Sequence, residues 1–373
     1  MPPFKLFATY WTRIREKLKQ LQDDFVKKHK YQWDAKLDNQ TPRERPLNED
    51  DAKEEVNKDK ETRDILHLQC LVDFMVKYLH EIPTLRDQIK TQQIESISFD
   101  DLWHLFNPGD VILGHSLSGK SEQQAYQVFT VTKGRYNMKK GRPDGSKSKG
   151  QWDRNNLQLQ CFSLDYDGTK IDTREELLFI KPFVGKKKIT DLDYYPKSFA
   201  TDEEVEDLRK RARLFINSRY GHGRCEGITT RFEIEHIDNE EVFVDFKSGY
   251  EELPVEWKKE IRRFGVVSIP DCSSEETYEP SCGILDCSSC NNYVYLDEQV
   301  DIKRAEKVRD RLPKSVPEDK INDLRKTPDH LLLLPQHLLV YTLRAKKWRT
   351  FPTPFRCAHW GSRGTTVSPM FAL

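Results

Sequence analysis

Residues 111–132 read VILGHSLSGKSEQQAYQVFTVT, and the interpretation of this stretch decides which fold the chain can have. Within it, residues 114–121 fit the phosphate-loop pattern G-x-x-x-x-G-K-[ST]. A phosphate loop lies between a buried strand and a helix, because the loop N–H groups and the helix N-terminus hold the phosphates together. Residues 126–132 instead alternate apolar and polar side chains and are rich in β-branched types, as in a half-buried strand. The pattern therefore favours strand, loop, strand.

Nucleotide binding stays open as the alternative. In that case the cofactor-binding residues are Gly114, Gly119, Lys120 and Ser121, and the ligand is ATP or GTP with magnesium. Lys120 would contact the β and γ phosphates, and Ser121 would coordinate Mg²⁺. A second carboxylate for the metal should follow an apolar strand, and residues 294–298 are the only candidate. No alternation of apolar strands and helices surrounds the octapeptide, as a doubly wound fold would require.

The rest of the chain predicts an α+β protein with a mostly antiparallel β core and covering helices, plus an N-terminal amphipathic helix. The Asp-Gly step at 167–168 is a hairpin signal between two strands. Thr201 and Glu204 form a capping box that opens a helix, which we expect to run to Gly221. Strands are expected at residues 110–114, 124–133, 157–165, 169–180, 226–236 and 241–246.

The N-terminal stretch carries apolar residues at alternating steps of three and four, which places them on one helical seam. Its many basic residues also allow a helix that lies on a membrane surface. We favour packing on the protein body or self-association through residues 4–25, because three heptads need a partner to bury their seam. The seam consists of Phe4, Phe7, Trp11, Ile14, Leu18, Leu21 and Phe25.

Composition limits the function classes. The formal net charge of the 373 residues is zero, so the whole molecule has no general attraction to nucleic acid, which disfavours a nucleic-acid partner. No run of 18 apolar residues exists, so we expect no membrane-spanning segment. The first residues lack an uninterrupted apolar stretch, so we expect an intracellular protein, cytoplasmic or nuclear, rather than a secreted one.

Four of the eight cysteines, Cys272, Cys282, Cys287 and Cys290, lie within residues 272–290. The spacing of Cys287 and Cys290 is that of half a zinc knuckle, so these four thiols are the candidate metal ligands, for zinc. Cys272 and Cys282 are too far apart for the usual short clip, and reduced thiols in an acidic loop are the alternative. No other cofactor is expected outside the nucleotide alternative.

Several short motifs occur in a characteristic order: ISFDDLWHLFNPGD at 97–110, LDYDG at 164–168 and ITDL at 189–192, followed by Tyr195-Pro196. This ordered set resembles a fungal domain of unknown function that typically precedes an AAA+ ATPase module in the same polypeptide. The resemblance covers about residues 94–250 and resumes near residues 329–348.

The resemblance implies a noncatalytic accessory domain, for recognition or regulation, that presents a surface to a protein partner. No catalytic residue is established for the family, so none is carried over. The chain ends without the family's downstream nucleotide loop, so we expect the ATPase module to be missing, as in a truncated product or an imperfect gene model.

The expected organisation has six parts. An amphipathic helix at 1–33 precedes a charged linker at 34–62, an α+β domain at 63–255, an irregular cysteine-containing segment at 256–328, a lead-in segment at 329–348 and an irregular tail at 349–373.

Overall fold

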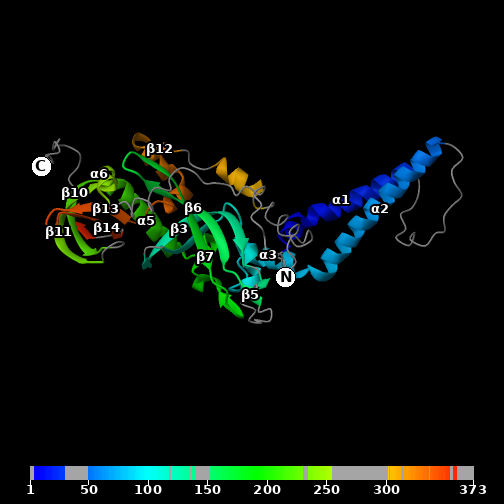
Figure 1. Ribbon diagram of the computed structural model, residues 1–373, viewed down its shortest axis with the longest axis horizontal. Helices are drawn as coiled ribbons and strands as arrows, with labels where there is room; N and C mark the ends of the chain where they lie inside the picture. The colour runs from blue at the N-terminus through cyan, green and yellow to red at the C-terminus, as the bar shows by residue number, and fades with distance from the viewer. Residues whose placement is uncertain are drawn as a thin grey trace, which may run out of the picture. The chain divides into compact units, whose positions relative to one another are not determined.

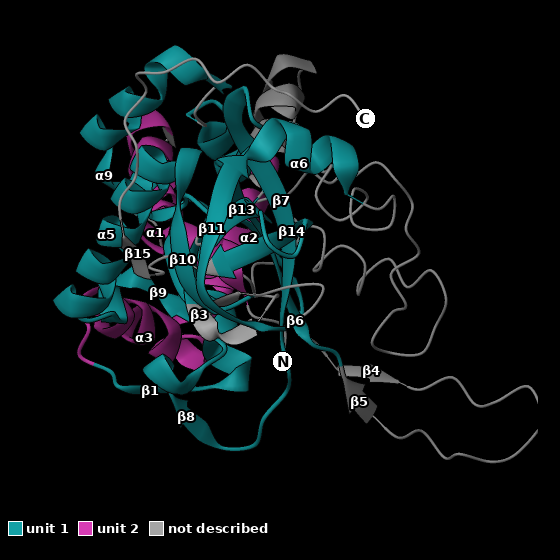
Figure 2. Ribbon diagram, turned by 90° about the vertical axis from the view of Figure 1, so that its left-hand side faces the viewer, with its two compact units in different colours: residues 1–3, 94–373 teal, residues 4–93 magenta. Residues whose placement is uncertain are grey.

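The computed structural model describes residues 4–29, 49–116, 119–134, 136–138, 152–229, 234–253, 301, 303–311, 315–335, 337–352 and 356–358. They divide into two compact units, a helical unit of residues 4–93 and a sheet unit of residues 94–373 (Figure 2). The expected α+β class, with mostly antiparallel sheets and an N-terminal helix, is confirmed.

The helical unit is built from α1 (Lys5–His29), α2 (Glu49–Tyr78) and α3 (Glu81–Lys90). α1 and α2 form an antiparallel pair, which Figure 1 shows side by side. Leu18 and Phe25 of the predicted seam are buried against Ile65 and Val72 of α2. The heptad spacing therefore serves an internal helix pair, which buries apolar surface that a lone helix would leave in water.

The charged stretch 34–62, expected to be a linker, is helical from Glu49 onward, and residues 30–48 lie outside the described part. A segment with few apolar residues buries little surface, but this composition does not prevent it from forming a helix. The stretch is rich in Glu and Lys, which are good helix formers, and acids at the N-terminus oppose the positive end of the helix dipole. Residues 63–93 consequently group with α1, and not with the sheets that follow.

The larger sheet of the sheet unit has the order β12-β7-β6-β3-β2-β9, and all its neighbours are antiparallel. Its central strand β6 is buried along nearly its whole length, so both faces of the sheet are covered. The strands are β2 (Val111–Ser116), β3 (Gly119–Lys133), β6 (Leu157–Tyr166), β7 (Lys170–Ile180), β9 (Tyr194–Pro196) and β12 (Val316–Pro317).

Helices and short pairs surround this sheet. α5 (Asp202–Ser218) buries Leu208, Ala212, Phe215 and Ile216 on its inward side. The remaining elements are β1 (Ser96–Ser98) paired with β8 (Lys186–Lys188), β4 (Tyr136–Met138) paired with β5 (Trp152–Arg154), α4 (Leu102–Leu105), α9 (Pro328–Leu332), and the 3-10 helices η2 (Phe99–Asp101), η3 (Ile189–Asp191), η4 (Lys197–Phe199) and η5 (Glu318–Lys326).

The second sheet has the order β14-β13-β11-β10-β15. β15 follows β14 in the sequence, yet it pairs with β10 at the opposite edge. This path is that of small five-stranded barrels, in which the last strand returns to the first. The elements are β10 (Tyr220–Ile228), β11 (His236–Asp245), α6 (Phe246–Glu252), β13 (His337–Thr342), β14 (Lys347–Pro352) and β15 (Arg356–Ala358).

Two expectations for this region are corrected. α5 ends at Ser218, and Gly221 lies inside β10 with φ of 137°, so Gly221 is not the helix cap. The strands expected at 226–236 and 241–246 are observed as β10 and β11, and the turn between them lies between Ile228 and His236, not within 237–240. A bulge in the pairing between Cys225 and Gly227 shifts the register, which alternation alone does not reveal.

The capping box of α5 is confirmed, and a hydrogen bond from Tyr195 of β9 joins it to the larger sheet. Glu204 N donates to Thr201 Oγ1 (3.2 Å), Thr201 N donates to Glu204 Oε2 (2.8 Å), and the Tyr195 hydroxyl donates to Glu204 Oε1 (2.8 Å). Partial burial opposes ionisation, but the hydrogen bonds from Thr201 and Tyr195 outweigh it and lower the pKa of Glu204 below its ordinary 4.5. The ionised carboxylate is therefore bound more strongly in the folded chain than in the unfolded one.

Replacing Glu204 by glutamine is expected to lower the free energy of unfolding by about 1 kcal/mol at neutral pH, the usual size of a lost capping interaction. Because the folded pKa is lowered, the contribution of Glu204 is present above pH 4.5 and is lost as the pH falls through the folded pKa. Thermal unfolding at a series of pH values should show the two proteins converging in acid. The exposed neighbour Glu203 is the control, since Glu203→Gln also removes a charge from the first turn but leaves the capping box intact.

Candidate functional site

The octapeptide 114–121 lies in the β2–β3 hairpin, whose last pair is Ser116 and Gly119. The strand β3 begins at Gly119, so the helix that a phosphate loop requires after Lys120 is replaced by a strand. The prediction of strand, loop, strand agrees with this backbone. The side chains of residues 115–122 lie outside the description, so nucleotide binding through Lys120 and Ser121 stays a prediction.

Gly114 has a packing role at this hairpin. A Cβ atom at Gly114 would lie 2.2 Å from Cδ1 of Tyr194 and 2.7 Å from the backbone oxygen of Asp193. Only glycine at position 114 therefore lets β9 approach β2 this closely. The first glycine of the motif is explained by the sheet, without a ligand.

The four candidate zinc ligands, Cys272, Cys282, Cys287 and Cys290, lie outside the described residues, so the metal site stays a prediction. Within the part of the chain that is described, no group of three or more His, Cys, Asp or Glu residues could hold a metal ion. His222 and Cys225 are close together in the sequence but lie on opposite faces of β10, because His222 is exposed and Cys225 is buried.

A charged cluster lies on the β6–β7 pair. Arg174 contacts Asp165 (Nη1 to Oδ2, 3.3 Å) and Glu176 (Nε to Oε1, 3.0 Å), and all three side chains are largely buried. Burial, followed by the charge of Glu176, raises the pKa values of the Tyr126 hydroxyl and the Cys161 thiol well above their ordinary values. A protonated thiol is a weak nucleophile, so these contacts favour a structural role.

The second sheet carries a row of aromatic side chains across four strands. His222, Phe243, Tyr341 and Trp348 are direct cross-strand partners in turn, on β10, β11, β13 and β14. Their neighbours along the strands, including Val242, Val244 and Val340, are buried, whereas His222 is exposed and Phe243, Tyr341 and Trp348 are half-buried. Because side chains alternate along a strand, the row lies on the face opposite the buried valines. We call Tyr220, His222, Phe243, Tyr341 and Trp348 the aromatic row.

Contacts between neighbouring rings fix the orientations of the side chains in the aromatic row. Tyr220, which is 50% exposed, lies edge-on to Phe243 with ring centroids 5.7 Å apart. Tyr341 and Trp348 form a second edge-on pair at 5.2 Å. Such pairs stabilise each other beyond the area that they bury. The rings are therefore preorganised in the unbound chain.

Helix α6 fixes one end of the row. Trp348 Nε1 donates to Glu252 Oε2 at 2.7 Å. A Cβ atom at Gly249 would come within 2.5 Å of Leu339 and 3.0 Å of the Trp348 ring, so only glycine lets the helix approach the indole this closely. At this end α6 also presents the exposed carboxylates of Glu251 and Glu252.

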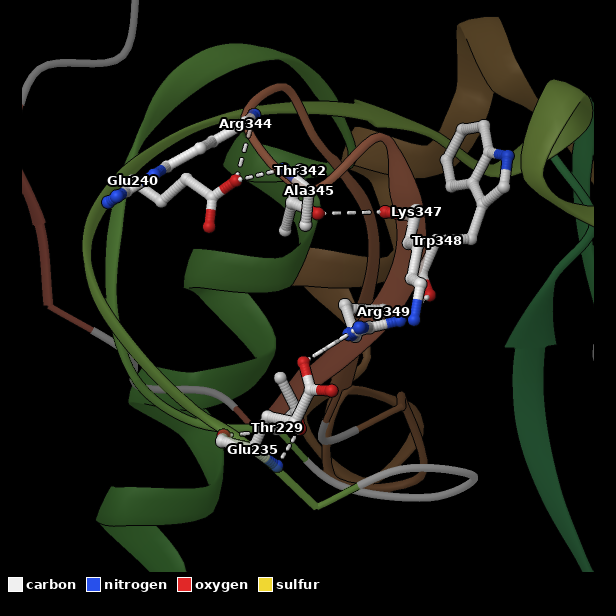
Figure 3. Close-up of polar contacts among 9 residues, drawn as sticks. All are labelled: Thr229, Glu235, Glu240, Thr342, Arg344, Ala345, Lys347, Trp348 and Arg349. Carbon is white, nitrogen blue, oxygen red and sulfur yellow. Dashed lines mark hydrogen bonds and ion pairs between the residues drawn. The ribbon is translucent and has the colours of Figure 1, made fainter.

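A basic turn lies beside the same end of the row, between β13 and β14, where only the Thr342–Lys347 pair separates it from Tyr341 and Trp348. The backbone N–H groups of Arg344 and Ala345 both donate to Glu240 Oε1 at 2.9 Å, which fixes the turn (Figure 3). The Arg349–Glu235 ion pair (Nη2 to Oε2, 2.7 Å) lies across β14 from the Trp348 ring. The turn exposes Arg344, Lys346 and, at the start of β14, Lys347, so basic and acidic side chains both lie beside the Tyr341–Trp348 end of the row.

Sequence reasoning missed the aromatic row. No local pattern connects the apolar stretch at 331–348 with the strand expected at 241–246. The signal that could have revealed the row is aromatic residues at outward positions of both stretches, Phe243 and Tyr341, each between residues that alternate as in a strand.

Together these features define an α+β protein with two antiparallel sheets, the smaller of which carries a preorganised aromatic row. Residues 87–201 match the profile of a domain of unknown function, DUF7025. The match covers the larger sheet except β12 and stops at the start of α5, so the aromatic row lies beyond it. The expected domain of unknown function is thereby confirmed for this range. No curated protein and no solved structure matches the chain.

Among the described residues, the structure contains no helix that is both long enough and apolar enough to cross a bilayer.

Proposed function

We propose that the chain is a noncatalytic recognition module that binds an extended segment of a partner protein along the aromatic row. The observation that carries this proposal is the set of cross-strand aromatic residues on the accessible face of the second sheet. Aromatic side chains dominate the binding energy of protein interfaces, because they bury much apolar surface at little conformational cost. Rings that are already ordered add to affinity, since less freedom is lost on binding.

The charges beside the row support a peptide over a nucleic acid. A strand of phosphates needs an excess of positive charge along its whole path. Here the basic turn of Arg344, Lys346 and Lys347 and the carboxylates of Glu251 and Glu252 all lie beside the Tyr341–Trp348 end, so an excess of positive charge does not follow the row. A peptide with an acidic residue, an apolar or aromatic centre and a basic residue complements this surface.

The accessory role follows the resemblance to the fungal domain that precedes AAA+ ATPases. In the proposal, the module selects partners for an ATPase of that class inside the cell, cytoplasmic or nuclear, and carries no catalytic residue itself. The internally paired charges of the β6–β7 cluster support a role without catalysis.

A phage-displayed library of random peptides, panned against the full chain, tests the proposal. We expect enrichment of peptides with an aromatic or aliphatic centre flanked by opposite charges. Trp348→Ala and Tyr341→Ala should each weaken the binding of a selected peptide about 30-fold, as for a hot spot of about 2 kcal/mol.

Phe179→Ala is the matched control, because Phe179 is 45% exposed on β7 and lies outside the aromatic row. It should bind the selected peptide as the unchanged chain does. Thermal unfolding of each variant separates loss of binding from loss of fold. Peptides that bind the Trp348 and Tyr341 variants with unchanged affinity would exclude the aromatic row as the site.

A further inference from the structure

A groove lies between α1 and α2 of the helical unit. Its volume is about 680 Å³, and Tyr10, Ile14 and Leu68 contribute its apolar part. Ile14 and Leu68 also pack on the buried cluster around Leu18 and Val72, so the groove opens onto the apolar seam of the hairpin. Arg13 and Lys17 of α1 are exposed beside it. A pair of helices covers its seam from one side only, and bundles complete such a seam with further helices.

α2 also extends past the end of α1. Lys28 is paired with Glu61, and Gln22 Nε2 donates to Gln69 Oε1 at 3.2 Å, which fixes the antiparallel register. Because α1 ends at His29, the α2 residues before Glu61 lie beyond it (Figure 1). We call residues 49–60 the overhang, which spans about 18 Å at 1.5 Å per residue.

The overhang and α1 have opposite charges. The overhang, EDDAKEEVNKDK, has six acids and three lysines, a formal charge of 3 − 6 = −3. Helix α1 has seven Lys or Arg and three acids, a formal charge of 7 − 3 = +4. Within one chain the overhang has no α1 residue opposite it in the described part, so these charges are not brought together by the hairpin.

We propose that a second copy of this chain occupies the groove. The two hairpins lie antiparallel, so that the acidic overhang of each copy runs along the basic α1 of the other, beside Arg13 and Lys17. A two-fold arrangement makes both contacts equivalent, and it converts two open hairpins into a four-helix bundle. This inference does not depend on the aromatic row, since it concerns the helical unit alone.

The test is the mass of the full chain in solution, measured by sedimentation at low and high salt. The unchanged chain should be dimeric at low salt, and its dissociation constant should rise at least about tenfold at about 0.5 M salt, because ions screen exposed charges. Arg13→Glu with Lys17→Glu, and separately Glu54→Lys with Glu55→Lys, should each give monomers, because each reversal places like charges in both contacts.

Mixing the two reversed proteins is the decisive step. In the mixed dimer one contact joins the reversed α1 to the reversed overhang, and the other joins an unchanged pair, so both contacts attract. The mixture should therefore form dimers although neither protein does so alone. A helix that failed to fold could not be restored in this way, which separates the interface from a folding defect.

Lys186→Glu with Lys188→Glu is the control, because these exposed lysines lie on β8 of the sheet unit. It should remain dimeric. A monomeric unchanged chain at low salt, reversed variants that stay dimeric, or a mixture that stays monomeric would each overturn the inference. Binding of a monomeric chain to anionic lipid vesicles, lost in the Arg13 and Lys17 variant, would show that α1 meets a membrane surface instead.

Discussion

Replacing Gly114 by alanine is expected to lower the free energy of unfolding of the sheet unit by about 3 kcal/mol, the upper part of the usual cost of overpacking. The added Cβ atom would meet Tyr194 Cδ1 at 2.2 Å and the Asp193 backbone oxygen at 2.7 Å. Neither neighbour can move easily. Tyr194 is buried, pairs with Gly114 across β2 and β9, and packs edge-on against Tyr126 with ring centroids 6.2 Å apart. Urea unfolding followed by tryptophan fluorescence measures the loss.

Gly185→Ala is the control for this substitution. Gly185 has a φ of 76°, so alanine there is strained, but no atom lies within 4 Å of the added Cβ. Its cost should be about 1 kcal/mol, that of an alanine in the left-handed region. A Gly114→Ala protein that unfolds like the unchanged chain would show that β9 does not approach β2 as closely as the structure has it.

Nucleotide titration separates the two interpretations of residues 114–121. If the stretch is only a hairpin, calorimetric titration with magnesium and ATP should show no saturable heat in the unchanged chain. If it holds a nucleotide, saturable micromolar binding should be present and should be lost in Lys120→Ala. That second result would contradict the noncatalytic module proposed above.

The elements that sequence reasoning located correctly are those specified by local pattern. The strands expected at 157–165 and 169–180 are observed as β6 and β7, because their alternation and the Asp-Gly turn act over neighbouring residues. The capping box at Thr201 is likewise a contact over three residues. Such signals survive in a single sequence because no distant partner is needed to form them.

The second sheet could not be predicted in the same way. β11 pairs with β13, although about ninety residues separate Asp245 from His337, and β15 pairs with β10 across a longer gap. No local pattern specifies which strands meet over such distances. The aromatic row depends on this pairing, since Phe243 and Tyr341 become neighbours only when β11 and β13 join. The site was therefore missed for the same reason as the sheet.

Phe246→Ala is expected to lower the free energy of unfolding by about 3–5 kcal/mol, the usual cost of removing a buried phenylalanine side chain. The ring of Phe246 is 1% exposed and lies edge-on to Tyr166 at 5.3 Å and to Phe215 at 5.7 Å. Tyr166 ends β6 of the larger sheet, Phe215 belongs to α5, and Phe246 begins α6 after β11 of the second sheet. This cluster of three rings therefore joins the two sheets.

A second contact at the same place strengthens this expectation. Gly168, in the turn between β6 and β7, has a φ of 94°, and a Cβ atom there would lie 2.5 Å from the backbone nitrogen of Lys247. The hairpin turn thus packs directly on the first turn of α6. Because this backbone contact and the cluster of three rings both join the two sheets, the sheets should unfold in one cooperative transition.

Hydrogen exchange measures this cooperativity directly. In the unchanged chain the amides of β6 and β13 should exchange with similar opening free energies, and Phe246→Ala should lower both by the same amount. Phe179→Ala, on the exposed side of β7, removes an equal side chain and should change either value by no more than about 0.5 kcal/mol. If the Phe246 variant loosened β13 alone and left β6 protected, the second sheet would be an independently folding domain. The aromatic row would then be able to move as one body relative to the larger sheet.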